Sequence, residues 1–251
     1  MAPHRFFVAP ELLRCSPISL EGELARQLSR VLRLKPGDRI ELLDNSGVAW
    51  LVALEQVTPA LCLAHEVARY RPDTEPATRL ILYQAISKGH KLDWVCQKAT
   101  ELGVSELVPV ATARSIGADL RQVGPTKLDR LQRIAQEAAE QSGRARVPVV
   151  RPAIPYAQAL AECAPDELAL IGALTPGALS LRQLLETRPA PPATVRLYVG
   201  PEGGLEEAEV EQARARGVLP ISLGPRVLRT ETAGLTLLAI VAYALGELEP
   251  R

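Results

Sequence analysis

The sequence predicts a two-domain α/β protein, with a small β-barrel followed by a parallel β-sheet covered by helices. Up to about Arg71, short β-type runs alternate with turn signals, a pattern typical of small barrels. The stretch 71–77 (RPDTEPA) holds two prolines and two acids and is typical of a linker. Beyond it, strand-like and helical segments alternate, which favours a parallel sheet. We therefore expect a barrel domain at 1–72, a linker at 73–78 and an α/β domain at 79–251.

Each element follows from local pattern. In the first domain, alternating apolar residues predict strands, and the turn Asp44-Asn45-Ser46-Gly47 separates the first two; the strands are 39–43, 48–54 and 60–67. A helix is expected over 20–32. In the second domain, buried apolar runs predict strands at 80–85, 107–110, 168–171, 195–199 and 220–223. Helical periodicity predicts helices at 91–102, 126–142, 181–185, 206–215 and 231–245.

Composition excludes several classes of protein. With 251 residues, 47% of them hydrophobic, the chain can bury a sizeable core. The uncharged stretch 232–246 is shorter than the ~20 residues of a membrane helix, and the N-terminus does not resemble a signal peptide, so we expect a cytoplasmic protein with no membrane partner. Three scattered histidines and four separated cysteines give no metal-ligand spacing. We expect no metal and no disulfide framework.

Charge is balanced overall but unevenly distributed. Residues 79–150 hold 11 Lys and Arg against 7 Asp and Glu, whereas residues 151–251 hold 9 against 12. In the first domain, Arg26, Arg30 and Arg33 are spaced to form one stripe of a helix, and His4-Arg5, Lys35 and Arg39 extend it. A solvated face is the ordinary interpretation of such a stripe. Its position beside a small β-barrel favours binding of RNA through the phosphate backbone.

A glycine-rich turn near the C-terminus has the layout of a phosphate site but carries acids. The stretch 197–213 (LYVGPEGGLEEAEVEQA) is an apolar strand, a turn and a helix. The turn matches neither the dinucleotide fingerprint nor a Walker loop, and Glu202, Glu206 and Glu207 would repel a phosphate. One interpretation is a tight turn whose acids complement the helix dipole, at about 0.3–1 kcal/mol each. The other is a binding turn for a ligand without phosphate.

A second turn of the same kind favours the binding interpretation. The stretch 222–234 (SLGPRVLRTETAG) again runs from strand through glycine turn to helix. Loops at the carboxyl ends of strands in an α/β sheet converge on ligands. Backbone groups there can bind adenine and ribose, and acids suit a cationic sulfonium. These features together indicate S-adenosylmethionine as the cofactor.

The final predicted helix is apolar almost all round. Its sequence over 233–245 is AGLTLLAIVAYAL, and such a helix must be covered on every side. Two arrangements satisfy that requirement. The helix is either a central core helix or part of a homodimer interface, where a second subunit supplies the cover.

The two turns and their flanks resemble a known family. The segments are VGPEGGLEEAEV (199–210), LGPRVLRTETAGLT (223–236), HRFFV (4–8), RVLRLKPGD (30–38), ISKGHKLDWVCQKATELGV (86–104) and EAAEQSGRARVPVV (137–150). They resemble the RsmE family, the 16S rRNA uridine-N3 methyltransferases of the SPOUT superfamily. The resemblance implies an N-terminal PUA-like barrel, a C-terminal α/β knot and a homodimer that acts on 16S rRNA in the small ribosomal subunit.

The resemblance also implies which residues bind S-adenosylmethionine. The two motifs (199–210 and 223–236, here called the first and second signature segments) and the strand at 168–172 would form the pocket. The expected cofactor-binding residues are Leu170, Ile171, Gly172, Val199, Gly200, Pro201, Glu202, Gly203, Gly204, Leu223, Gly224, Val227, Leu228, Thr230, Thr232 and Ala233.

The chemistry of uridine N3 points to catalytic candidates. N3 carries a weakly acidic proton on the pairing edge, so the base must be unpaired and the proton lost before N3 attacks a methyl group. Arg226 and Arg229 can stabilise the resulting anion with permanently charged guanidinium groups. Glu231 is either the proton acceptor or the residue that orients an arginine. We favour orientation, because a carboxylate near two arginines is a poor base.

Further basic residues are candidates for the RNA path. The expected RNA-binding residues are Arg5, Arg26, Arg30, Arg33, Lys88, Lys91, Arg114 and Arg144. Two alternative functions stay open. One is a SPOUT methyltransferase acting elsewhere, on a ribose 2′-hydroxyl or a tRNA guanine. The other is a non-catalytic RNA-binding assembly factor, which predicts a degraded cofactor loop.

Overall fold

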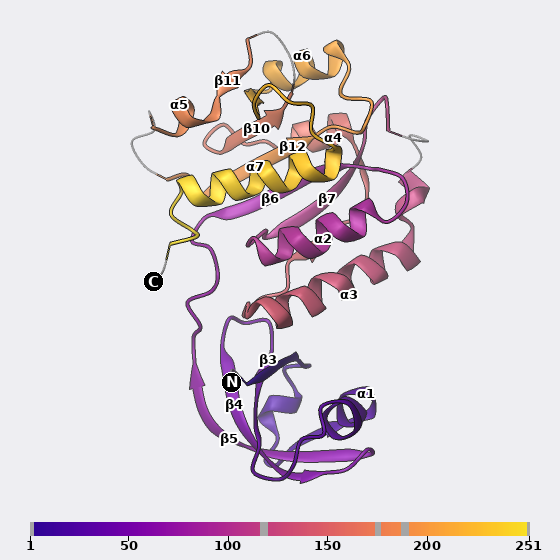
Figure 1. The fold of residues 1–251 in the computed structure, drawn as a ribbon, viewed down its shortest axis with the longest axis vertical. Helices are drawn as coiled ribbons and strands as arrows, with labels where there is room; N and C mark the ends of the chain where they lie inside the picture. The colour runs from indigo at the N-terminus through magenta and orange to yellow at the C-terminus, as the bar shows by residue number, and fades with distance from the viewer. Residues whose placement is uncertain (1–2, 116–119, 174–176, 187–190, 250–251) are drawn as a thin grey trace. The chain divides into compact units, whose positions relative to one another are not determined.

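The computed structural model describes residues 3–115, 120–173, 177–186 and 191–249. The chain divides into two compact units (Figure 1): the first comprises 1–75 and 139–147, and the second 76–138 and 148–251. Within the described ranges, no helix is both long and apolar enough to cross a bilayer.

The first unit is built on a five-stranded sheet. Its strands, in the spatial order β1-β3-β4-β5-β2, are β1 (His4–Phe7), β3 (Arg39–Leu43), β4 (Ala49–Val57), β5 (Leu61–Tyr70) and β2 (Ile18–Glu21). Only the pairing of β1 with β3 is parallel among these strands. Apolar residues from alternate positions, including Leu20, Ile40 and Val52, form one core with Leu28. The sheet curls around this core, as the barrel prediction requires.

The expected helix over 20–32 is shorter and less regular than predicted. Its first residues form β2, α1 spans Gly22–Arg26, and a π-helical turn covers Gln27–Val31. Arg33 follows in a left-handed conformation with φ +54°. Arg26, Arg30 and Arg33 are all exposed, but Arg33 lies beyond the helix. The stripe is therefore interrupted, because the wider π turn and the reversal at Arg33 change the direction of the chain.

The second unit is an eight-stranded parallel sheet. Seven strands follow the spatial order β11-β13-β10-β12-β6-β7-β8, and β9 pairs with β7. Their bounds are β6 (Arg79–Ala85), β7 (Glu106–Ala111), β8 (Val149–Val150), β9 (Ile154–Pro155), β10 (Leu168–Gly172), β11 (Leu179–Ser180), β12 (Thr194–Val199) and β13 (Leu219–Ser222). The register aligns Gly172 with Val199 and with Ile221. The carboxyl ends of three neighbouring strands thus meet at one edge.

Helices cover both faces of this sheet. Their bounds are α2 (Lys91–Glu101), α3 (Pro125–Ser142), α4 (Tyr156–Ala161), α5 (Leu181–Glu186), α6 (Glu207–Ala215) and α7 (Thr230–Ala244). α4 and α6 pack on one face, where Tyr83, Ile171 and Tyr198 contribute to the core. α7 packs on β12, β6 and β10 beside α2 (Figure 1). Short 3-10 helices lie at Leu12–Arg14 and Leu120–Val123.

Among the described residues of the single chain, α7 is covered on one side only. Leu237, Leu238 and Val241 are buried against the sheet. On its other side Ile240 is 41% exposed and Tyr243 66% exposed. Of the two arrangements expected for this apolar helix, the described residues of the single chain therefore do not form a core position that covers it all round.

Candidate cofactor site

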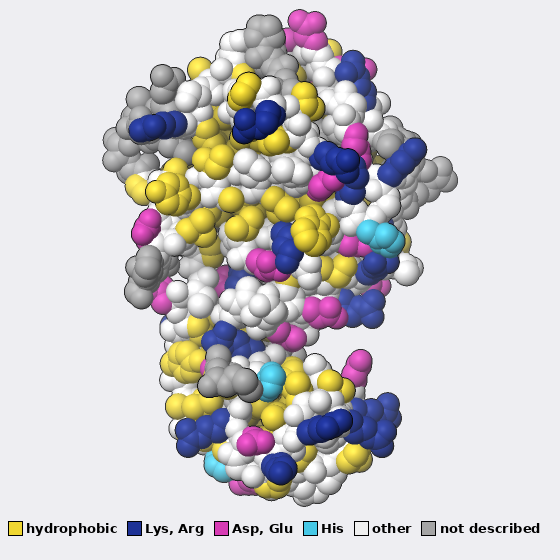
Figure 2. Space-filling view, in the orientation of Figure 1, with side chains coloured by type: hydrophobic (Ala, Val, Ile, Leu, Met, Phe, Trp, Pro, Cys, Tyr) yellow, Lys and Arg dark blue, Asp and Glu magenta, His cyan; other side chains and the backbone are white. Residues whose placement is uncertain are grey.

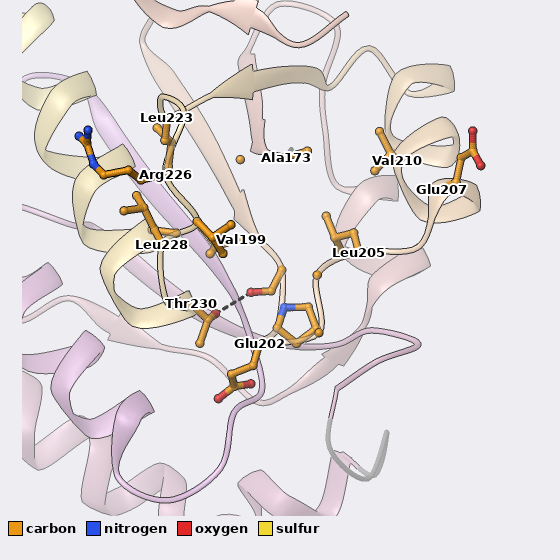
Figure 3. Close-up of a pocket in the computed structure, with 17 residues that line it drawn as sticks. Ala173, Val199, Glu202, Leu205, Glu207, Val210, Leu223, Arg226, Leu228 and Thr230 are labelled. Carbon is orange, nitrogen blue, oxygen red and sulfur yellow. Dashed lines mark hydrogen bonds between the residues drawn. The ribbon is translucent and has the colours of Figure 1, made fainter. Parts of the chain in front are cut away.

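The two signature segments line one cavity of about 570 Å³ at the carboxyl ends of β10, β12 and β13 (Figure 3). Most of the expected cofactor residues line it. These are Gly172, Val199, Gly200, Pro201, Glu202, Gly203, Gly204, Leu223, Val227, Leu228, Thr230 and Ala233. The convergence expected from two glycine turns is therefore present in the fold.

Four expected cofactor residues lie outside the lining. Leu170 and Ile171 are fully buried within β10, where successive side chains enter opposite faces of the sheet. Gly224 serves the second turn with φ +100°, a conformation that favours glycine. Thr232 is exposed on α7. Only the last residue of β10, Gly172, reaches the cavity, because a strand presents a ligand site only at its end.

The cavity wall also includes residues that the sequence analysis did not assign to it. These are Ala173, Leu205, Glu207, Val210 and, from the catalytic candidates, Arg226. Leu205 and Val210 lie on the wall opposite Leu228 (Figure 3). Leu205 directly follows the glycine turn, and Val210 lies near the start of α6. Their position just after the glycine turn was the sequence signal that could have assigned them to the cavity wall.

Hydrogen bonds from outside the turn fix its backbone. The Thr230 hydroxyl donates to the Gly200 carbonyl at 2.5 Å and accepts from the Gln84 amide at 2.8 Å. The Arg114 guanidinium donates to the Gly203 carbonyl at 3.0 Å. Gly204 adopts φ +70°, a region that L side chains rarely enter. The first signature turn is thus held by side chains from β6, from α7 and from the loop after β7.

The acids of the turn serve the protein itself. Glu206 caps α6, and its backbone amide donates to the Glu209 carboxylate at 2.9 Å, completing a capping box. These carboxylates occupy the helix N-terminus where a phosphate would bind. Glu202 turns out of the cavity (Figure 3) and pairs with Lys91 at 2.7 Å. The site therefore suits a nucleoside without phosphate, because carboxylates already occupy the place of a phosphate. This reason differs from the attraction between acids and a sulfonium that the sequence suggested.

Lys91 lies between the two signature segments. Its ammonium is 2.7 Å from Glu202 and 3.3 Å from Glu231. The hydrogen bond to Glu202, with the nearby negative charge of Glu231, raises the pKa of Lys91 despite some desolvation. Desolvation opposes ionisation of Glu202, but the hydrogen bond and charge of Lys91 outweigh it and lower the Glu202 pKa. Lys91 and Glu202 are therefore both charged at neutral pH.

The catalytic candidates lie at the second signature segment. Arg226 lines the cavity and is exposed, and Arg229 is exposed at the residue before α7. Glu231 lies in the first turn of α7 and pairs with Lys91. Glu231 thus pairs with a lysine from a distant segment, whereas the sequence analysis favoured a neighbouring arginine as its partner.

The candidate RNA residues divide by exposure. Lys88 and Arg114 are both exposed, and Arg114 also donates to the Gly203 carbonyl. In the first unit, Arg5 is half-buried and pairs with Glu41 at 2.5 Å. Arg144 is buried and pairs with Glu75 at 2.7 Å. Arg144 therefore acts as a structural ion pair in this conformation, because RNA has no direct path to a buried guanidinium.

No group of three His, Cys, Asp or Glu side chains suited to a metal occurs in the described ranges.

Comparison with known proteins identifies the family of both units. Residues 74–242 match the family model described as an RNA methyltransferase domain, and residues 20–64 match one described as an RNA methyltransferase PUA domain. Ribosomal RNA small subunit methyltransferase E of Synechocystis is 34% identical over 94% of this chain and 76% of the relative. The Bacillus subtilis protein of the same name is 30% identical over 90% of this chain and 89% of the relative.

Solved structures agree in fold. Ribosomal RNA small subunit methyltransferase E from Neisseria gonorrhoeae, bound to S-adenosyl methionine, superimposes with a TM-score of 0.86 at 32% identity, covering 96% of this chain and 98% of that one. A Legionella pneumophila methyltransferase with bound cofactor has a TM-score of 0.83 at 29% identity and covers 97% and 98%. The predicted fold class, a SPOUT methyltransferase domain after a PUA-like domain, is confirmed. The chain belongs to the ribosomal RNA small subunit methyltransferase E family.

Proposed function

We propose that the protein transfers the methyl group of S-adenosylmethionine to N3 of a uridine in 16S rRNA. The observation that carries the proposal is the cavity shared by both signature segments at the carboxyl edge of the sheet. Relatives with S-adenosylmethionine bound have the same fold over nearly the whole chain. The expected cofactor residues that line this cavity are the residues we assign to the cofactor.

The cavity fits this cofactor by size and by chemistry. Its volume of about 570 Å³ falls within the roughly 300–1,000 Å³ of typical ligand pockets. Val199, Leu205, Leu223 and Leu228 provide an apolar wall suited to an adenine ring. Glu206 and Glu209 fill the N-terminus of α6, which disfavours a nucleotide phosphate. S-adenosylmethionine bound there supplies a methyl group attached to a positively charged sulfur.

Arg226 and Arg229 carry the catalytic step in this proposal. Loss of the N3 proton places negative charge on the uracil ring, and the guanidinium groups of the second signature segment stabilise that charge. Both arginines are exposed and therefore accessible to RNA. Glu231 is held by Lys91, so we assign it to positioning and not to proton transfer.

Two variants separate binding from catalysis. Arg229→Ala is expected to reduce methyl transfer to small ribosomal subunits by at least a hundredfold, the usual effect of removing a transition-state donor, with cofactor affinity within about twofold of wild type. Gly203→Val is expected to lose cofactor binding first, because its side chain would crowd Arg114, which holds the turn that lines the cavity. Radiolabel transfer and calorimetry with S-adenosylmethionine measure the two effects. Loss of cofactor binding in Arg229→Ala would contradict its catalytic role.

The first unit is proposed to hold the RNA. Arg26, Arg30 and Arg33 are exposed around the π-helical turn, within the segment that matches an RNA methyltransferase PUA domain. Contacts of these arginines with phosphates would position the RNA without reading its sequence. Replacing all three with Gln is expected to weaken RNA binding and reduce its salt dependence, while cofactor affinity stays unchanged.

A homodimer is the proposed assembly. Figure 2 shows hydrophobic side chains gathered over the exposed side of α7, where Ile240 and Tyr243 lie. Val227, in the wall of the cavity, is 83% exposed. A second subunit would remove this apolar surface from water, which is the usual driving force for such assemblies.

A further inference from the structure

Lys91 connects three elements that are far apart in the sequence. It is the first residue of α2. Its ammonium lies 2.7 Å from Glu202 in the first signature turn and 3.3 Å from Glu231 in the first turn of α7. One side chain thus reaches both segments that build the cofactor cavity. The group formed by Lys91, Glu202 and Glu231 is called the lysine bridge below.

Lys91 does not stabilise α2, the helix that carries it. The N-terminus of an α-helix has partial positive charge, so a lysine at the first position is unfavourable by a few tenths of a kcal/mol or more. Asp93 in the same turn has the favourable sign. The ammonium is therefore stabilised by contacts outside α2, and the two carboxylates of the lysine bridge are those contacts.

Glu231 needs a cation where it lies. Its side chain is only 16% exposed, and its Oε2 atom is buried without a hydrogen bond among the described residues. A buried carboxylate oxygen without compensation is costly. Lys91 faces that same atom at 3.3 Å, a distance suited to charge compensation. The lysine bridge thus stabilises the start of α7 as well as the turn.

The lysine bridge completes the attachment of the first signature turn. Thr230 binds the Gly200 carbonyl and Arg114 binds the Gly203 carbonyl. Glu202 lies between these two attachment points and is held by Lys91. Its carboxylate points out of the cavity (Figure 3), so the contact shapes the wall and does not itself occupy the ligand space.

We propose that Lys91 is a positioning residue of the cofactor site, which holds the first signature turn and the start of α7 in the conformation that binds S-adenosylmethionine. The inference rests on the proposed function for the identity of the ligand. It assigns to Lys91 a role different from the RNA contact expected from its charge alone. Without the lysine bridge, the turn would have to be ordered by the ligand itself, and affinity would fall by that cost.

The test compares Lys91→Met with Lys91→Arg and a matched control. Lys98→Met removes a lysine from the last turn of the same helix, where Lys98 pairs with Glu101 at 2.7 Å. Lys91→Met is expected to weaken S-adenosylmethionine binding by roughly fivefold to tenfold, as for a charge-assisted, partly buried contact. Lys91→Arg should recover part of that loss, and Lys98→Met should bind as wild type. The loss should appear in KM for the cofactor with kcat within about twofold.

Hydrogen exchange of the protein without ligand tests the positioning itself. Amides of 200–206 are expected to exchange faster in Lys91→Met than in wild type, with no change in Lys98→Met. This readout does not depend on the cofactor, so it stays decisive even when S-adenosylmethionine fails to bind the wild-type protein, a result that would overturn the proposed function alone. Glu202→Gln removes the ion pair between Lys91 and Glu202 at an exposed position. It should increase the exchange rate of the same amides.

A double-mutant cycle distinguishes the lysine bridge from separate effects. Glu202→Gln and Lys91→Met are expected to be non-additive, so the double variant binds S-adenosylmethionine about as weakly as the weaker single variant. Unchanged exchange at 200–206 and unchanged cofactor affinity in Lys91→Met would overturn the proposal. So would a loss confined to RNA affinity, because Lys91 would then be an RNA contact.

Discussion

Thr230 joins the two signature segments through one hydroxyl group. It accepts a hydrogen bond from Gln84, which is 1% exposed, and donates to the Gly200 carbonyl. Gln84 belongs to β6, at the end nearest the cavity. A central strand thus fixes a binding turn through a residue of the second segment. The other polar atom of the amide, Gln84 Oε1, is buried and has no hydrogen-bond partner among the described residues.

Replacing Thr230 with Val should therefore cost more than one hydrogen bond. The change keeps the shape but leaves the Gln84 amide and the Gly200 carbonyl without this partner, at about 1–3 kcal/mol for each buried group. We expect a lower denaturant midpoint and weaker S-adenosylmethionine binding, measured by chemical unfolding and calorimetry. Thr236→Val, a change of the same chemistry in the same helix, serves as the control. Equal effects of both variants would contradict the role of Thr230.

Gly234 offers a second prediction at this scale. In an ordinary helix, Gly→Ala stabilises by about 1 kcal/mol. At Gly234 a Cβ atom would lie 2.4 Å from Gln84 Oε1, so the substitution forces the Gln84 side chain out of its bond with Thr230. Gly234→Ala is expected to lower the unfolding midpoint and the cofactor affinity together. A raised midpoint in chemical unfolding would show that the contact relaxes without cost.

At the scale of elements, a partly buried layer of ion pairs joins strands of the second sheet. Arg196 in β12 pairs with Glu167 at 2.5 Å and donates to the Tyr83 hydroxyl, which in turn donates to Glu162 at 2.7 Å. Arg151 binds Glu162 through two bonds of 2.6 and 2.8 Å. The rings of Tyr83 and Tyr198 stack with centroids 4.5 Å apart. These contacts join β6, β12 and the segments after β8 and α4.

This layer predicts acid sensitivity. Hydrogen bonds from Arg151 lower the pKa of Glu162, and hydrogen bonds from Arg196 lower the pKa of Glu167, both from 4.5. Because the folded values lie below the unfolded ones, the stabilisation is complete above about pH 4.5 and is lost as the pH falls through the folded values. Chemical unfolding between pH 6 and pH 3 should show this loss. Glu167→Gln should be less stable at pH 6 and lose less on acidification.

The sequence predicts local elements well and long-range contacts poorly. The strand Arg39–Leu43 has its predicted bounds, and α2 and α7 begin and end within one residue of theirs. These elements are predictable because hydrophobic periodicity depends only on residues close together in the sequence. β1 and the six-residue α4 are too short for a periodic signal. The contacts of Gln84 and Lys91 with residues more than a hundred positions away depend on the order in which the strands lie in the sheet. Sequence pattern therefore identified the cavity segments, while the residues that hold them together required the fold.

At the scale of the whole molecule, the exposed side of α7 leads to a prediction about assembly. Tyr243 is 66% exposed on a helix with few charges. Placing a charge there by Tyr243→Glu should oppose burial of this surface against a second subunit. Light scattering coupled to size exclusion is expected to give a dimer for wild type and a smaller species for the variant. A wild-type monomer at micromolar concentration would contradict the proposed homodimer.

The central claim, methylation of uridine N3, is tested most directly by the nucleoside that the protein makes. The purified protein would be incubated with radiolabelled S-adenosylmethionine and small ribosomal subunits lacking this methylation, and the 16S rRNA digested to nucleosides. We predict label in 3-methyluridine with wild type and at least a hundredfold less with Arg229→Ala. Label in a ribose-methylated nucleoside or a methylated guanosine, or bound cofactor without any transfer, would contradict it.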